Sequence, residues 1–143
     1  MLALVDETLG TQASTARIGL QRRLTTVVVD DSASFLEVIC ALLESDDEVD
    51  VVARGRDGID AITMVDKLRP DLVLMDIDMP NLDGLNASLI ISRCFPRTLI
   101  VLMSAEESPE LKADCLACGA AGFVCKTFFR QDFPLLLEEL VAH

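Results

Sequence analysis

Five polar side chains stand at the ends of short apolar segments that we expect to be strands. Asp30 and Asp31 end the first such segment, and Asp76, Ser104 and Lys126 end the third, fourth and fifth. Because open parallel sheets bind ligands beyond the carboxyl ends of their strands, we expect these five side chains to share one edge. Carboxylates crowded in this way repel one another and raise their pKa values unless a cation lies between them. The grouping therefore implies a bound metal ion.

The available ligands favour a hard cation. The group offers only oxygen ligands, the single histidine, His143, is terminal, and Cys125 lies inside an expected strand. Such a set suits Mg²⁺, which binds through one or two carboxylates and keeps several waters. A carboxylate beside Mg²⁺ and a lysine ammonium can attack a phosphoryl group in line, because both cations neutralise charge on the phosphoryl oxygens. The chemistry that we expect is therefore phosphoryl transfer to a carboxylate.

The position of each acid indicates its role. Asp76 is the expected nucleophile because it is the acid on the central strand. We expect Asp31 to bind the metal directly and Asp30 to bind it directly or through water. The backbone carbonyl of Asp78 completes the expected set of protein ligands.

The remaining polar groups would contact the phosphoryl group itself. We expect Lys126 to pair with it and the Ser104 hydroxyl to donate to one of its oxygens.

The alternative to a metal site is that Asp30 and Asp31 only cap the following helix. Capping needs a single acid and leaves Asp76 and Lys126 unexplained, so we favour the metal site.

Strands and helices alternate strictly along the chain and would position these residues. β-branched and apolar runs predict strands over 25–30, 49–54, 71–76, 98–104 and 121–126. Helical periods follow them: one capped by Ser32, one capped by Asp57 and stopped by Pro70, one from Gly84 to before Pro96, and two over 107–118 and 131–141. This alternation predicts an α/β fold, a doubly wound parallel sheet of five strands with five helices.

Length and charge limit the classes of protein that need to be considered. The 143 residues suit one domain, which we place at 25–143 after a flexible or loosely helical extension over 1–24. No apolar run approaches the roughly 20 residues that span a bilayer, and the first residues lack the basic start of a secretory signal, so we expect a cytoplasmic protein. A net charge of −12 argues against direct binding to nucleic acid or to anionic membranes.

The cysteines and two other features have ordinary explanations. The cysteines are odd in number and lie in apolar segments, which predicts reduced, buried thiols at 40, 94, 115, 118 and 125. We interpret the Cys115–Cys118 pair as core packing, because no second pair has zinc-binding spacing. The acidic run at 44–50 is interpreted as a solvated loop. Phe128, Phe129 and Phe133 are expected in the core, with a docking surface as the alternative.

Four segments carry a resemblance to a known family. VVVDDS, LVLMDIDMPNLDGL, VLMSA and GAAGFVCK, in this order and at these separations, resemble the receiver domains of two-component response regulators, over roughly residues 25–142. They look most like receivers that precede helix-turn-helix DNA-binding domains. The resemblance implies a flavodoxin-like, CheY-like sheet of order 2-1-3-4-5.

The resemblance also implies roles for individual residues. Asp76 matches the phosphoacceptor, Asp30 and Asp31 the metal-binding pair, Ser104 the switch hydroxyl and Lys126 the lysine of the family. Phe123 stands where the family has an aromatic switch residue.

Four positions modify what the resemblance implies. Thr127 replaces a frequent proline, and Phe123 lacks the hydroxyl of the common tyrosine, so a switch there would work by packing alone. The side chains of Asp78 and Glu106 are expected to flank the site and to modulate hydrolysis of the aspartyl phosphate.

The implied partners are a sensor histidine kinase or histidine phosphotransfer protein and a downstream target. The target would be a protein, an output domain or a second copy of the chain, bound through the fourth helix, fifth strand and fifth helix. The implied protein is a signalling switch that catalyses its own phosphorylation and dephosphorylation, and is not an enzyme with a separate substrate.

Two other functions are weighed against this one. Asp76-Ile77-Asp78 after an apolar strand also resembles the nucleophile motif of haloacid-dehalogenase-like phosphohydrolases, although that motif lies near the start of its domain and seldom continues with the Pro80 found here. A phosphorylation-independent pseudo-receiver scaffold is the second alternative. The complete set of five polar residues argues against it.

Overall fold

The computed structural model describes residues 23–142. The predicted extension over 1–24 therefore lies almost wholly outside the described residues. Arg23 and Leu24 are within them. Leu24 already begins the first strand, and its backbone N–H donates to the carbonyl of Glu48 over 2.8 Å.

Five parallel strands form one sheet, as the sequence predicts. The strands are β2 (Leu24–Val29), β3 (Val49–Gly55), β4 (Leu72–Asp76), β5 (Leu99–Ser104) and β6 (Gly122–Cys125). Their order across the sheet is β3-β2-β4-β5-β6, and every neighbouring pair is parallel. When β2 is counted as the first strand of the sheet, this order is 2-1-3-4-5, which confirms the predicted doubly wound sheet.

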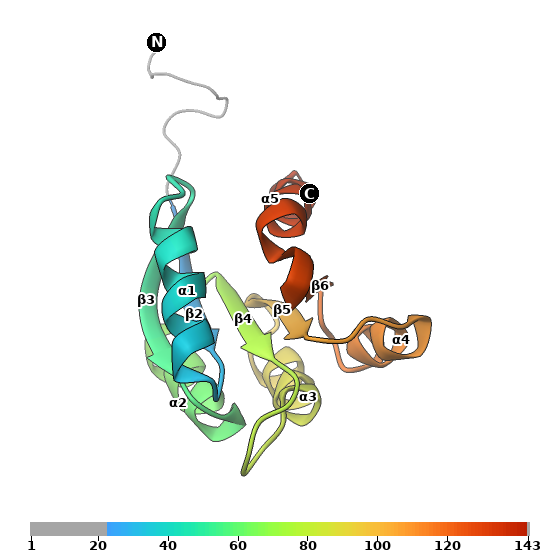
Figure 1. The fold of residues 1–143 in the computed structure, drawn as a ribbon. Coiled ribbons are helices and arrows are strands. Elements are labelled where there is room, and N and C mark those ends of the chain that lie inside the picture. Colours follow the sequence, from blue (N-terminus) through green and yellow to red (C-terminus); the bar gives the residue numbers. More distant parts are fainter. Residues whose placement is uncertain (1–22, 143) are drawn as a thin grey trace.

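Within residues 23–142, four α-helices connect successive strands, and a short 3-10 helix and a fifth α-helix follow the last strand. The helices are α1 (Ala33–Glu44), α2 (Gly58–Leu68), α3 (Gly84–Cys94), α4 (Pro109–Ala117), the 3-10 helix η1 (Lys126–Phe128) and α5 (Phe129–Val141). Helices α1 and α5 pack on one face of the sheet and α2, α3 and α4 on the other. Figure 1 shows α1 in front of the sheet and α2 and α3 behind it.

Capping side chains explain where several helices begin. Ser32 and Asp57 accept hydrogen bonds from the first turns of α1 and α2, as predicted. Asp83 does the same for α3. Helix α4 begins at Pro109 and not at the predicted 107, because Ser108 accepts from the N–H of Leu111 and proline suits the first helical position.

A second deviation from the predicted elements lies after the last strand. The strand ends at Cys125, so Lys126, predicted as its final residue, instead begins η1. Helix α5 then begins at Phe129, two residues before the predicted 131, because the 3-10 turn leads directly into it.

The strands divide the core into two layers. Val28 belongs to the cluster under α1 and α5, whereas its neighbours Val27 and Val29 belong to the cluster under α2, α3 and α4. This alternation follows from the two-residue period of a strand. Every residue of β4 is buried, as expected for the central strand of a sheet covered on both faces.

The prediction that all cysteines are buried is only partly right. All five are free, and Cys40, Cys115 and Cys125 are buried. Cys118 is half-buried and Cys94 is exposed, because Cys94 closes α3 beyond Ile91, the last buried residue of that helix.

The aromatic residues near the start of α5 divide in a similar way. Phe129 and Phe133 are buried, with their rings stacked at 4.8 Å between centroids, which confirms the core interpretation for these two. Phe128 is 50% exposed and does not belong to the core.

Among residues 23–142, no helix has the length and apolar character needed to cross a bilayer.

Candidate metal and phosphoryl-transfer site

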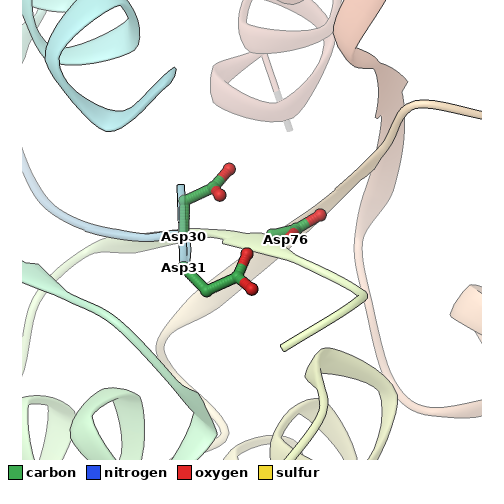
Figure 2. Close-up of side chains that lie close together, drawn as sticks. All are labelled: Asp30, Asp31 and Asp76. Atoms are coloured by element: carbon green, nitrogen blue, oxygen red, sulfur yellow. The ribbon is translucent and has the colours of Figure 1, made fainter. Parts of the chain in front are cut away.

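Three carboxylates meet beyond the carboxyl ends of two neighbouring strands. Asp30 and Asp31 directly follow β2, and Asp76 ends β4, which pairs with β2 up to Val29 and Met75. One oxygen from each carboxylate lies within 4.8 Å of the others. Figure 2 shows the three side chains gathered in one region at these strand ends. The structure therefore brings together the three acids that the sequence singled out.

Asp30 has an oxygen suited to a cation. The residue is fully buried, and its Oδ1 accepts from the N–H of Ser32 over 2.9 Å. Its Oδ2 forms an ion pair with Nζ of Lys126 at 2.8 Å. Lys126 alone does not balance the charge of the three carboxylates, and a hard cation would neutralise the remainder. The donor set therefore fits Mg²⁺.

The capping alternative for the acids is wrong. Ser32 occupies the N-cap of α1, where its hydroxyl accepts from the N–H of Phe35 over 3.2 Å. Asp31 is exposed beside Asp30 and is free to contribute a carboxylate oxygen to a metal. Its backbone carbonyl accepts from Nη2 of Arg56 over 2.6 Å, a contact that the sequence did not reveal.

Asp76 is held in a strongly unfavourable environment for a charge. Burial raises the pKa of its carboxyl to about 6, and the charges of Asp30 and, less strongly, Asp31 act in the same direction. Lys126 opposes them, with Nζ at 3.3 Å from Oδ1 of Asp76. A second cation near these carboxylates would favour the ionised, nucleophilic form of Asp76.

Lys126 is the cation that contacts the acid cluster. Burial works against its charge, but the hydrogen bond to Asp30 and the charge of Asp76 raise its pKa above the ordinary value. Its ammonium also lies 4.3 Å from the centre of the Phe35 ring on α1. Two carboxylates and one aromatic face therefore surround this side chain.

Ser104 lies on the strand next to Asp76. In the register of β4 and β5, Asp76 is opposite Met103, and Ser104 is the next residue. Ser104 is buried, and its hydroxyl oxygen accepts from the N–H of Glu106 over 3.1 Å. Phe123 is half-buried and pairs with Leu102, two residues before Ser104 on β5.

Asp78 and Glu106 lie in the loops that follow β4 and β5. Both are exposed at the same edge of the sheet as the acid cluster. The loop after β4 is fixed at its far end, where the N–H of Gly84 donates to the carbonyl of Ile77 over 2.8 Å. A Cβ at Gly84 would lie 2.2 Å from the carbonyl oxygen of Asp76, so only glycine permits this close approach.

A second contact that the sequence did not reveal connects this loop to α2. Nδ2 of Asn81 donates to Oδ2 of Asp57 over 2.7 Å, and the N–H of Gly58 donates to the carbonyl of Leu82 over 2.9 Å. Asn81 has a φ of 67°, a left-handed conformation that asparagine tolerates better than most residues. The loop that carries Asp78 is thus bound to the N-terminus of the neighbouring helix.

Comparison with known proteins finds similarity over most of the chain. The sequence model of the response regulator receiver domain matches residues 26–138. The protein-glutamate methylesterase/protein-glutamine glutaminase of Pyrococcus abyssi is 39% identical over 85% of this chain and 34% of its own length. The transcriptional regulatory protein DegU of Brevibacillus brevis is 31% identical over 82% of this chain and 49% of its own length.

Solved receiver domains have the same fold. The response regulator domain of Thermotoga maritima CheB has a TM-score of 0.74 at 33% identity, covering 85% of this chain and 96% of that domain. The signal receiver domain of Mycobacterium tuberculosis NarL has a TM-score of 0.75 at 28% identity, with the same coverage.

The chain belongs to the response regulator receiver domain family of two-component systems. It spans about a third of the length of the methylesterase relative and about half that of DegU. Membership of this family favours a receiver over the haloacid-dehalogenase-like alternative.

Proposed function

We propose that this chain is a phosphorylation switch that accepts a phosphoryl group on Asp76 in the presence of Mg²⁺. The donor is a phosphohistidine on a sensor kinase or on a histidine phosphotransfer protein. The observation that carries the proposal is the group of Asp30, Asp31 and Asp76 within 4.8 Å, with Lys126 in contact with two of them.

In the proposed reaction, an oxygen of Asp76 bonds to phosphorus as the bond from phosphorus to the donor imidazole nitrogen breaks. The leaving imidazole takes up a proton, so that atoms and charges balance. Lys126 pairs with the phosphoryl oxygens and Ser104 donates its hydroxyl to one of them.

The proposed metal ligands are Asp30, Asp31, Asp76 and the backbone carbonyl of Asp78. Mg²⁺ bound there supplies positive charge that neutralises the carboxylates and the phosphoryl oxygens. Exposed at the rim, the side chains of Asp78 and Glu106 are placed to affect how water reaches the aspartyl phosphate, and so to set its lifetime.

The proposed switch runs from Ser104 to Phe123. When Ser104 turns toward the phosphoryl group, the space that it vacates becomes available to the half-buried ring of Phe123. Phenylalanine has no hydroxyl, so this movement would depend on packing alone. The local change in charge would then alter the face formed by α4, β6 and α5.

That face is the proposed docking surface. Leu116 of α4 and Leu135 and Val141 of α5 are each at least 48% accessible to solvent. The partner would be a downstream protein, an output domain or a second copy of the chain. We propose a cytoplasmic switch that catalyses only its own phosphorylation and dephosphorylation, with no direct contact with nucleic acid or membrane.

Intact mass spectrometry tests the central step. After incubation with acetyl phosphate and Mg²⁺, the chain should gain the mass of one phosphoryl group, and hydroxylamine should remove it. The adduct should disappear in Asp76→Asn and with a chelator. It should persist in Asp66→Asn, which removes an exposed carboxylate of α2 that pairs with Arg69.

Two results would contradict the proposal. An adduct that survives in Asp76→Asn would place the phosphoryl group elsewhere. If the unaltered chain forms no adduct and binds no beryllofluoride, the phosphorylation-independent scaffold becomes the better account.

A further inference from the structure

The ring of Phe35 is the uncharged partner of Lys126 in the site. It projects from the first turn of α1, two residues after Ala33 begins the helix, and its centre lies 4.3 Å from Nζ. An ammonium at this distance is attracted to the negative face of the ring. The lysine side chain is only 17% exposed, so water screens this attraction weakly.

The two charged partners of Lys126 are also the proposed metal ligands. A divalent cation beside Asp30 and Asp76 would take up much of their negative charge and would repel the ammonium. The aromatic face carries no net charge for the metal to neutralise, so its attraction for the ammonium would persist. Lys126 must remain near Asp76 in that state if it is to pair with an incoming phosphoryl group.

We propose that Phe35 is a positioning residue that keeps the Lys126 ammonium beside Asp76 when metal and phosphoryl group are bound. This inference rests on the proposed function. Phe35 also packs against the core layer under α1 and α5. A useful test must therefore separate the attraction of the ring from the burial of apolar surface.

Calorimetric titration with beryllofluoride, a phosphoryl mimic, in saturating Mg²⁺ makes that separation. Phe35→Leu keeps an apolar side chain but removes the aromatic face, and it should weaken the binding of the mimic about three- to tenfold. Phe35→Tyr retains the face and should bind within about twofold of the unaltered chain. Binding of Mg²⁺ alone should be the same in all three proteins, because neither the ring of Phe35 nor its replacements supply a ligand atom to the metal.

Phe95→Leu is a matched control. Phe95 is also half-buried, and its ring lies 4.9 Å from the guanidinium of Arg69. Phe95 follows α3 and precedes β5, so it lies near the amino ends of the strands, whereas the acid cluster lies at their carboxyl ends. Phe95→Leu should therefore not change binding of the mimic. In a Lys126→Met background, Phe35→Leu should likewise cause no further loss.

The outcomes distinguish this inference from the proposed function. If the unaltered chain does not bind beryllofluoride, the proposed function fails. If it binds, and Phe35→Leu binds equally well or Phe35→Tyr is as weak as Phe35→Leu, the positioning role is overturned. A parallel loss of Mg²⁺ affinity would also overturn it. Should Phe35→Leu fail to fold by circular dichroism, Phe35→Met provides the same comparison.

Discussion

Asp76 shows at the scale of one residue that the site works against the stability of the metal-free protein. Its carboxyl has a pKa of about 6 in the fold against 3.8 ordinarily. A difference of about two units corresponds to roughly 3 kcal/mol of unfavourable free energy when the group is ionised. The side chain is only 5% exposed, so solvent reduces this cost little.

Asp76→Asn should therefore stabilise the metal-free protein at neutral pH, by about 1–3 kcal/mol. The gain is smaller than the full cost because burying an amide without a full set of hydrogen-bond partners is itself unfavourable. Because the pKa is raised by folding, the cost is absent below the unfolded pKa of 3.8 and complete above about 6. Urea unfolding with a chelator should show the stabilisation at pH 7 and its disappearance near pH 4.

The pH dependence of the stabilisation shows whether relief of the buried charge of Asp76 causes it. Asp66→Asn removes a solvent-exposed charge and should show no such pH-dependent gain. A stabilisation by Asp76→Asn that persists unchanged at pH 4 would mean that packing, and not the relief of a buried charge, is responsible.

At the scale of elements, the contact between Asn81 and Asp57 joins two loops at the edge of the site. The amide of Asn81 and the N–H of Asp60 both donate to Asp57 and hold the pKa of its carboxyl below the ordinary value. A pKa lowered by folding contributes stability above the unfolded value and loses it as the pH falls through the folded value.

Asn81→Gly should raise the pKa of Asp57 and lower the free energy of unfolding at neutral pH. Glycine keeps the left-handed φ of 67° accessible, so the change removes the amide without straining the backbone. The loss should shrink as the pH falls below the ordinary pKa of 3.8 and through the lowered pKa of Asp57 in the folded protein. Carboxyl NMR titration with urea unfolding at pH 7 and pH 3 would measure both effects.

A nearby asparagine provides the comparison. Asn86 donates to Asp83 within the first turn of α3 and joins no separate element. Asn86→Ala should leave the pKa of Asp57 unchanged. If Asn81→Gly also leaves it unchanged, the contact contributes nothing in solution.

The same elements show what the sequence could predict. The strands were predicted to within about two residues because apolar β-branched runs end at polar residues, and Asp30, Asp76 and Ser104 followed from that rule. The contact of Asn81 with Asp57 spans 24 positions and has no helical or strand period, so no pattern pointed to it. The approach of Phe35 to Lys126 depends on how α1 packs beside η1, which no pattern in the sequence shows.

At the scale of the whole molecule, the site exists only when the complete sheet is assembled. Its residues lie between Asp30 and Lys126 and come from the ends of four strands. The first strand is held at its start by Arg23, whose Nη2 donates to the carbonyl of Val49 over 3.0 Å. Two residues later, the N–H and hydroxyl of Thr25 both donate to the carboxylate of Asp71.

A chain that begins at Arg23 should therefore form the whole receiver domain. We expect it to unfold in one transition, with circular dichroism and beryllofluoride binding lost together, because both core layers and all site residues remain. A chain that begins at Val27 loses the contacts of Arg23 and Thr25 and half of β2, and it should not fold. If the chain from Arg23 unfolds in two steps or binds the mimic more weakly than the full chain, residues 1–22 contribute to the domain. The boundary would then have to be placed before them.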